Sequence, residues 1–270
     1  MTSIPELLQA LVYQGWGAPL SFALGTLWGS FFNVCILRIP ADQSIVTDSS
    51  RCPKCLRGLR WYMNIPILSY AWLRGKCAYC EEKISIQYPI VEAISGCMFL
   101  WLFHRFGWNG QFLAYGLFCS LLLVISVIDL YHQIIPDELS LSGLVLGLLV
   151  SVALKDIRWL DSVLGVVAGG GIFLAVAYGY EKVSGREGLG GGDIKLLAMI
   201  GAWLGLHSIL LVIVVSSFLG ALVGVTLMFF QRKNFKMAIP FGPFLAVGAF
   251  VYLFWGHELQ LLLIPNYGIE

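Results

Sequence analysis

Long, almost uninterrupted runs of apolar residues dominate this sequence of 270 residues. Several of these runs are roughly 20 residues long, which is the length that an α-helix needs to cross the hydrocarbon core of a bilayer. Apolar and aromatic residues make up 58% of the chain and charged residues 12%, whereas a soluble domain carries about 25% charged residues. The sequence therefore predicts an all-α, polytopic membrane protein.

About eight transmembrane helices are expected, and the first of them is expected to be retained rather than cleaved as a signal peptide. Its apolar run is too long for the central region of a signal peptide, and no basic residue precedes Arg38. The sixth and seventh segments nearly touch, and we expect a turn between them near His207 and Ser208. The predicted segments are residues 15–37, 88–106, 110–130, 137–154, 160–180, 193–206, 208–230 and 239–263.

The distribution of basic residues predicts how these helices are oriented. If residues 38–87 lie in the cytoplasm and both chain ends lie outside, 14 of the 17 Lys and Arg residues face the cytoplasm. Only Arg105, Lys155 and Arg158 then lie outside, which agrees with the excess of Lys and Arg in the cytoplasmic loops of membrane proteins. We therefore predict that the N- and C-termini lie on the non-cytoplasmic side of the membrane.

The polar, basic stretch at residues 38–87 divides the chain into three predicted parts. Residues 1–37 contain the first transmembrane helix, residues 38–87 form a small cytoplasmic insert, and residues 88–270 form the membrane core. The formal net charge of +1 gives no indication that nucleic acid is a partner, and we expect membrane lipid to surround the apolar helices.

Four of the seven cysteines stand in two Cys-x-x-Cys pairs within this insert. The pairs are "CPKC" (52–55) and "CAYC" (77–80), and pairs at such a separation can hold one zinc ion between four thiolates. Because disulfides are rare in the cytoplasm and about 50 residues hardly form a stable core alone, we expect a structural zinc site. Four buried or paired cysteines without metal are the alternative. The expected ligands are Cys52, Cys55, Cys77 and Cys80.

The segment between the two pairs, residues 61–76, mixes aromatic and aliphatic residues with Arg and Lys. Such a composition suits a segment that lies on the membrane surface, and it equally suits one that covers the zinc site. The other cysteines, Cys35, Cys97 and Cys119, lie alone in apolar segments, where we expect them to be packing residues.

Few acidic residues lie inside the predicted helices, where ionisable groups are costly and mark candidate functional sites. Glu92, Asp129 and Asp193 all fall near the cytoplasmic ends of their segments. Asp129 and Asp193 can therefore meet, share one proton, activate a water molecule and protonate a leaving amine, as the two carboxylates of aspartic proteases do. Transporters also place carboxylates within their helices, so the residues alone leave a proton or cation pathway equally open, and a scaffold with structural acids is a third option.

The stretch "GLGGGDIK" (188–195) places glycines directly before Asp193. Gly190 and Gly192 permit unusual backbone conformations and the close approach of another backbone, as the extended substrate of a protease requires. A transporter could use an interrupted helix here to bind an ion. Lys195 lies on a different helix face from Asp193, so we expect its side chain to extend to the cytoplasmic surface or to support the site rather than to pair with Asp193.

Other polar residues near the acidic pair have ordinary interpretations. Asp137 and Glu138 follow Pro136 at the start of a predicted helix, where proline and acidic residues are typical. His132 follows Asp129 by three residues and could touch it.

Several stretches, spread in order over nearly the whole chain, resemble the type IV prepilin peptidase family, also called prepilin leader peptidase/N-methyltransferase. The paired cysteines surround one of them, and the glycine-rich stretch before Asp193 resembles the GxGD motif of the family. The matching stretches are "GSFFNVCILRIP" (29–40), "NIPILSYAWLRGKC" (64–77), "ISIQYPIVE" (84–92), "IDLYHQIIPDELSL" (128–141) and "GLGGGDIKLLAMIGAWLG" (188–205).

The resemblance implies an enzyme of the bacterial cytoplasmic (inner) membrane with prepilins or pseudopilins of type II secretion as substrates. It implies that the chain cuts the basic leader after a glycine and methylates the new N-terminal residue with S-adenosylmethionine. Asp129 and Asp193 are then the catalytic pair, and the intact cysteine pairs imply the bifunctional form. The resemblance suggests Gly75 and Lys76 as the place of the methyl donor. An ion-coupled secondary transporter remains the alternative.

Overall fold

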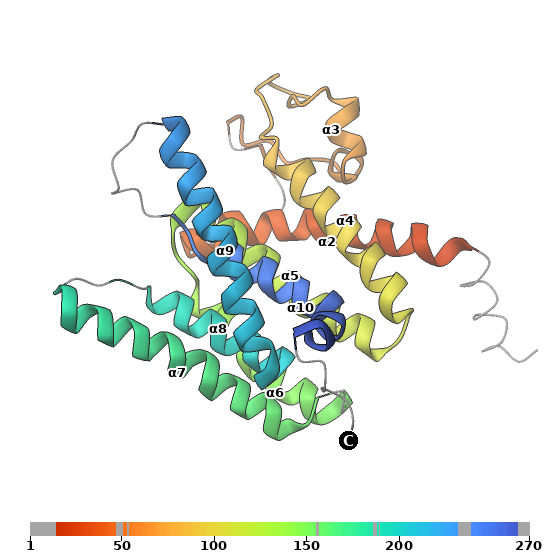
Figure 1. Ribbon diagram of the computed structural model, residues 1–270. Coiled ribbons are helices and arrows are strands. Elements are labelled where there is room, and N and C mark those ends of the chain that lie inside the picture. Colours follow the sequence, from red (N-terminus) through yellow and green to blue (C-terminus); the bar gives the residue numbers. More distant parts are fainter. Residues whose placement is uncertain are drawn as a thin grey trace, which may run out of the picture. The chain divides into compact units, whose positions relative to one another are not determined.

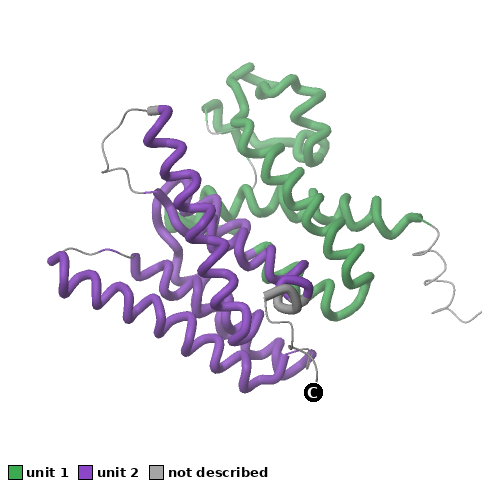
Figure 2. The backbone as a smooth tube through the Cα atoms, viewed as in Figure 1, with its two compact units in different colours: residues 1–120 green, residues 121–270 purple. Residues whose placement is uncertain are grey.

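The computed structural model describes residues 15–46, 51–52, 54–154, 157–185, 188, 190–231 and 239–263. Over these residues every named element is a helix (Figure 1). The chain divides into two compact units, residues 1–120 and 121–270 (Figure 2), and the boundary falls within one long helix, α5 (Gly110–His132). Some of the basic residues counted to predict the orientation, namely Lys155, Arg186, Arg232, Lys233 and Lys236, lie outside the described residues.

Unit 1 contains two long helices and the insert that connects them. The long helices are α2 (Gly17–Arg38) and α4 (Gln87–Phe106), and the shorter elements are η2 (Ile39–Ala41), η3 (Trp61–Asn64) and α3 (Leu68–Trp72). In the described part of the insert, two isolated antiparallel bridges join Arg51 to Gly58 and Lys76 to Lys83. The insert is therefore held together by short turns rather than by a core of regular elements.

Helices α2 and α4 cross at close range because glycines line their contact. A Cβ atom added to Gly25 would lie 2.5 Å from the carbonyl oxygen of Ser95, and one added to Gly29 would lie 2.7 Å from the Cα atom of Glu92. Small residues spaced four apart let membrane helices approach closely enough for their backbones to pack. The glycines of the first apolar segment thus bring Glu92 against α2.

Unit 2 is built around a short central helix. Its helices after α5 are α6 (Asp137–Leu154), α7 (Trp159–Ser184), α8 (Gly191–Leu204), α9 (Leu206–Gln231) and α10 (Gly242–Leu263). Helix α8 contacts α6, α7, α9 and α10, and every residue from 196 to 204 is buried. A helix that is apolar on all sides has to be covered on all sides. The uniform apolarity of this segment therefore fits a place at the centre of the unit.

Helices α7 and α8 touch through two glycines. A Cβ atom on Gly165 would lie 2.3 Å from the carbonyl oxygen of Gly201, and one on Gly201 would lie 2.2 Å from that of Gly165. On another side of α8, the indole N–H of Trp203 donates a hydrogen bond of 2.7 Å to the carbonyl oxygen of Gly143 in α6. Backbone contact and a polar side chain thus fix α8 between its neighbours.

Substituting alanine for Gly165 is expected to destabilise the protein by about 1–3 kcal/mol, because the added methyl group overlaps the backbone of α8. Gly171 provides the matched control, since it lies on the same helix and a Cβ atom there would meet nothing within 4 Å. Gly171→Ala should leave the stability unchanged or raise it slightly. Thermal unfolding of the purified protein in detergent measures both effects, and equal unfolding temperatures for the two variants would contradict the close crossing.

Each of the eight segments that the sequence predicts to be transmembrane corresponds to a helix, which confirms the all-α fold class. The break between the sixth and seventh segments falls at Gly205, with φ +78°, whereas His207 and Ser208 lie within α9. Five helices among the described residues, namely α2, α5, α6, α7 and α9, are long and apolar enough to cross a membrane. Large apolar side chains such as Val167, Leu174 and Phe218 are 64%, 59% and 67% exposed, as expected for surfaces that face lipid. The total number of crossings remains a prediction.

Candidate active site and metal site

Asp129 lies in the last turn of α5 and is buried, with 5% of its surface exposed. The backbone N–H of Gly242, the first residue of α10, donates a hydrogen bond of 2.8 Å to its Oδ2 atom. A Cβ atom at residue 242 would lie 2.7 Å from the same oxygen, so a larger residue there would displace the carboxylate. Helix α5 ends just beyond, where the N–H of Gln133, with φ +55°, donates to the Asp129 carbonyl oxygen. Two helix ends therefore fix this carboxylate.

Asp193 lies in the first turn of α8, where a carboxylate is favoured by the helix dipole. Gly190 takes an extended conformation and accepts a hydrogen bond of 3.1 Å from the N–H of Asp193. Gly192 packs so closely against Ile135, in the turn between α5 and α6, that a Cβ atom would lie 2.8 Å from that side chain. The glycines thus let the start of α8 approach the end of α5.

This approach brings together two acids that are far apart in the sequence. Asp129 is close enough to Asp193 for the two carboxylates to interact electrostatically, and both belong to unit 2. Two neighbouring carboxylates at helix ends can hold one proton between them and can act together as acid and base. The structure therefore supports the predicted juxtaposition. His132, in contrast, is exposed in the last turn of α5, and the buried contact of Asp129 is with Gly242 instead.

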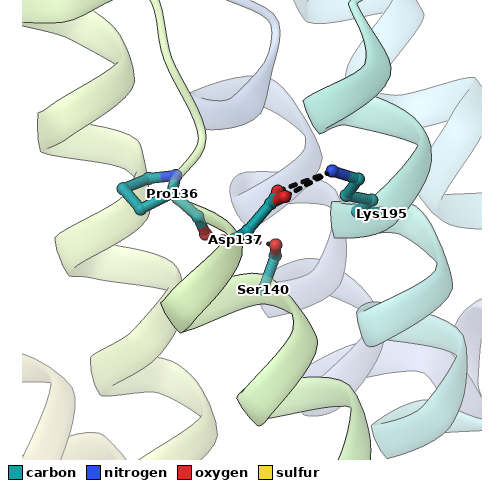
Figure 3. A network of polar contacts seen from close by, with 4 residues as sticks. All are labelled: Pro136, Asp137, Ser140 and Lys195. Atoms are coloured by element: carbon teal, nitrogen blue, oxygen red, sulfur yellow. Dashed lines mark hydrogen bonds and ion pairs between the residues drawn. The ribbon is translucent and has the colours of Figure 1, made fainter.

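Lys195 has a partner on another helix. Its Nζ atom lies 2.6 and 2.7 Å from the two carboxylate oxygens of Asp137, the first residue of α6 (Figure 3). In the same turn of α6, the hydroxyl of Ser140 donates a hydrogen bond to the carbonyl oxygen of Pro136. Lys195 thus ties the first turn of α8, two residues after Asp193, to the first turn of α6. The acidic residue after Pro136 therefore has a tertiary contact in addition to its ordinary place at a helix start.

The four cysteines of the insert come together. Their sulfur atoms all lie within 4.8 Å of one another, and the Sγ atoms of Cys52 and Cys80 are 3.8 Å apart. A zinc ion with Zn–S bonds of about 2.3 Å places sulfurs about 3.8 Å apart at the corners of a tetrahedron. The sulfur set therefore fits a zinc ion in number, chemistry and spacing. The structure brings together all four predicted ligands, namely Cys52, Cys55, Cys77 and Cys80.

The two cysteine pairs have the same backbone turn. In the first, the N–H of Leu56 donates to the Cys52 carbonyl oxygen at 2.9 Å, and in the second the N–H of Glu81 donates to that of Cys77 at 3.0 Å. Leu56 and Glu81 both have φ +57°, although neither is glycine. Hydrogen bonds from the backbone N–H groups of Tyr79 and Cys80 lower the pKa of Cys77 to about 7. The second turn therefore favours the thiolate form of Cys77, which is the form that binds metal.

Gly75 and Lys76 lie directly before the second cysteine pair, in a turn that follows α3. Gly75 has φ +69°, and its N–H donates to the carbonyl oxygen of Tyr70 at 2.9 Å. Trp61 and Trp72 of the same segment are 80% and 88% exposed, so they do not cover the cysteine cluster. Their exposure favours the interpretation that residues 61–76 lie on the membrane surface.

Two hydrogen bonds to the buried acidic residues could not be predicted from the sequence. The donor to Asp129 comes from Gly242, 113 residues further along the chain, and the only signal was the local "PFGP" stretch at 240–243. Glu92 accepts a hydrogen bond from the backbone N–H of Ile67 in the insert. That backbone donor carries no signature in the sequence.

The sequence also matches known families and proteins. Residues 23–106 match the Bacterial Peptidase A24 N-terminal domain, and residues 116–225 match the Type IV leader peptidase family. A prepilin leader peptidase/N-methyltransferase of Xanthomonas campestris pv. campestris is 37% identical over 273 residues, which cover 92% of this chain and 94% of the relative. Proteins of the same name from Stutzerimonas stutzeri and Pseudomonas aeruginosa are 36% and 35% identical, over 93% of each relative and 89% of this chain. No solved structure matches the chain.

The chain therefore belongs to the type IV leader peptidase family. This membership confirms the predicted resemblance and the prediction that the chain is an enzyme. It gives no support to the alternative of an ion-coupled transporter. Together with the apolar helices, it identifies a multi-pass membrane protein.

Proposed function

We propose that this chain cleaves the basic leader from type IV prepilins or type II secretion pseudopilins and then methylates the new N-terminal residue with S-adenosylmethionine. One observation carries the peptidase activity: the first turn of α8, which contains Asp193, packs through Gly192 against Ile135, just beyond the end of α5 that contains Asp129. The two activities in the names of the relatives support the combination of cleavage with methylation.

In the proposed cleavage step, Asp129 and Asp193 hold one proton between them. The ionised carboxylate removes a proton from water, whose oxygen attacks the carbonyl carbon of the glycine that ends the leader. The protonated carboxyl group donates its proton to the amide nitrogen as the C–N bond breaks. The leader leaves with a new carboxyl group and the pilin with a new amine. The N–H of Gly242 keeps the Asp129 carboxylate in a fixed orientation throughout.

The glycines before Asp193 leave space for the substrate. A Cβ atom on Gly191 would meet nothing within 4 Å, whereas Gly192 packs against Ile135. One side of this turn is therefore packed against the protein and the other is open. A prepilin is itself helical, and its peptide bonds have to be extended before water can attack them. An open, glycine-lined side next to Asp193 suits such an extended segment.

We place the methyl donor beside Gly75 and Lys76. The exposed ammonium group of Lys76 suits the carboxylate of S-adenosylmethionine, and the positive φ of Gly75 shapes the turn next to it. S-adenosylmethionine bound there would supply a methyl group to the lone pair of the new N-terminal amine, which would lose a proton as S-adenosylhomocysteine leaves. The four cysteines would hold a structural zinc ion that maintains the turn following Lys76.

We also propose on which side of the membrane each part of the chain lies. The insert of residues 38–87 lies in the cytoplasm, both chain ends are periplasmic, and residues 88–270 form the membrane core after a first transmembrane helix in residues 1–37. The acids then lie at the cytoplasmic membrane face, where water and the basic leader are both available.

Mass spectrometry of a defined reaction tests the proposed function. Purified protein in detergent is incubated with a prepilin, with and without S-adenosylmethionine. We expect loss of the leader in both reactions and the gain of one methyl group only with the donor. Release of the leader without methylation would contradict the proposed methyltransferase activity. An intact prepilin in both reactions would contradict the proposed function as a whole.

Substituting methionine for Lys195 is expected to slow cleavage by about three- to fivefold, because the ion pair with Asp137 holds the turn that carries Asp193. The effect is small because both side chains are partly exposed to solvent. The double variant Lys195→Asp/Asp137→Lys should restore most of the rate. The exposed pair of Arg158 and Asp161 is the control, and Arg158→Met should leave cleavage unchanged. A Lys195→Met rate equal to that of the unaltered chain would show that the pair is not needed.

A further inference from the structure

Glu92 is a buried carboxylate that the proposed mechanism does not use. It lies in α4 with 7% of its surface exposed, in a helix that is otherwise mostly apolar. Its Oε2 atom accepts a hydrogen bond of 2.7 Å from the backbone N–H of Ile67, and it also interacts with the hydroxyl of Ser30 in α2. A buried carboxylate is costly unless it is hydrogen-bonded, so these contacts call for a physical role. They join the two long helices of unit 1 to the insert.

The backbone of Ile67 is strained at the point that Glu92 contacts. Ile67 has φ +61° and ψ −49°, and a β-branched residue rarely adopts a positive φ. Such a conformation persists only where the surroundings hold it. Ile67 is the residue directly before α3, and its N–H has the Glu92 carboxylate as its acceptor. The carboxylate therefore fixes the direction in which α3 starts.

The position of α3 in turn determines the position of Gly75 and Lys76. The Tyr70 carbonyl oxygen in α3 accepts the Gly75 N–H at 2.9 Å, and a Cβ atom on Gly75 would lie 2.9 Å from the Tyr70 hydroxyl. The N–H of Lys76 donates to the carbonyl oxygen of Leu73 at 3.0 Å. On the far side, the N–H of Ile84 donates to the Gly75 carbonyl oxygen at 2.8 Å. A continuous series of contacts thus leads from Glu92 through α3 to this turn.

We propose that Glu92 is a positioning residue for methyl transfer: by holding the strained backbone of Ile67, it keeps Gly75 and Lys76 in the arrangement that binds the methyl donor. This inference rests on the proposed function, because Gly75 and Lys76 are the proposed donor site. Glu92 acts as a hydrogen-bond acceptor in this role, and its negative charge is not required.

Two substitutions of Glu92 separate the acceptor from the charge. Glu92→Ala removes the acceptor, and we expect methylation of a cleaved pilin to fall at least about tenfold, mainly through a higher KM for S-adenosylmethionine. Glu92→Gln keeps an acceptor oxygen without the charge, and we expect methylation within about threefold of the unaltered chain. Leader cleavage should change by less than about twofold in both variants. Ile94→Ala, at an exposed apolar site on the same helix, is the control and should change neither activity.

A second substitution tests the strain directly. Glycine adopts a positive φ without cost, so Ile67→Gly in the Glu92→Ala background should recover part of the lost methylation. If Glu92 acted through packing alone, Ile67→Gly would restore no methylation in the Glu92→Ala variant. Trypsin cleavage after Arg74 and Lys76 provides a readout that does not depend on activity. It should rise at least about tenfold in Glu92→Ala and fall again in the double variant.

Each result decides between the proposals. If Glu92→Gln is as inactive as Glu92→Ala, the charge itself is needed and the positioning role is wrong. If trypsin cuts the unaltered chain and Glu92→Ala equally, Glu92 does not hold the turn. If the unaltered chain cleaves a prepilin and does not methylate it, the proposed donor site fails, while the trypsin experiment still decides whether Glu92 holds Gly75 and Lys76.

Discussion

Substituting asparagine for Asp129 or for Asp193 is expected to reduce leader cleavage at least about a thousandfold, while the protein still folds. Asparagine has nearly the same shape as aspartate and can still accept the hydrogen bond from the Gly242 N–H. It cannot take a proton from water or return one to the leaving amine. Either substitution removes one half of the acid–base pair, so each single variant should be as inactive as the double variant. The rate of leader release, followed by mass spectrometry, measures the loss.

The control for this experiment is Asp137→Asn. Asp137 is an acidic residue at the start of α6, paired with Lys195 and outside the proposed pair, and its amide variant should retain cleavage within about fivefold. Methylation of a pilin whose leader has already been removed should be unaffected in the Asp129 and Asp193 variants. If either of these two variants cleaves a prepilin at the rate of Asp137→Asn, the assignment of the catalytic pair is wrong.

The helices could be predicted because their cause is local. An apolar run in a membrane leaves the backbone no partners but its own, so predicted segments such as 88–106 and 160–180 form helices. The cysteine cluster could be predicted for a similar reason. Two short Cys-x-x-Cys turns can each supply two sulfurs, and an insert of this size needs a metal ion or another cross-link to be stable. The positive φ of Leu56 and Glu81 could not be predicted, because neither residue is the glycine that usually takes this conformation.

The contacts that complete the site could not be predicted because their partners are distant or lie on the backbone. Gly242 supports Asp129 from 113 residues away, and Lys195 reaches Asp137 over 58 residues. Helical spacing correctly excludes an ion pair of Lys195 with Asp193, but it says nothing about which neighbouring helix supplies a carboxylate. The donor to Glu92 is a backbone N–H, which every residue except proline carries. Only the folded insert, in which Ile67 directly precedes α3, shows which residue supplies it.

Removing zinc from the cysteine cluster is expected to reduce methylation strongly and to leave leader cleavage largely unchanged. Structural zinc contributes about 10–16 kcal/mol to the folding of small cysteine domains at pH 7. The described residues of the insert include few buried apolar side chains, so Cys52→Ser or prolonged chelation should unfold it and reduce methylation at least about a hundredfold. Asp129 and Asp193 belong to unit 2, so cleavage should remain within about threefold. Metal analysis together with both assays measures the result.

The exposed Cys97 in α4 gives the matched control, because it is a cysteine outside the cluster. Cys97→Ser should keep one zinc ion per chain and both activities. Readdition of zinc should restore methylation after chelation, but not in Cys52→Ser, where the fourth ligand is weaker. Equal loss of both activities on chelation would mean that the insert also supports the peptidase and that the two reactions are not separable. Full methylation by a zinc-free chain would show that the cysteines need no metal and that the hydrogen bonds of the two turns suffice to hold Lys76.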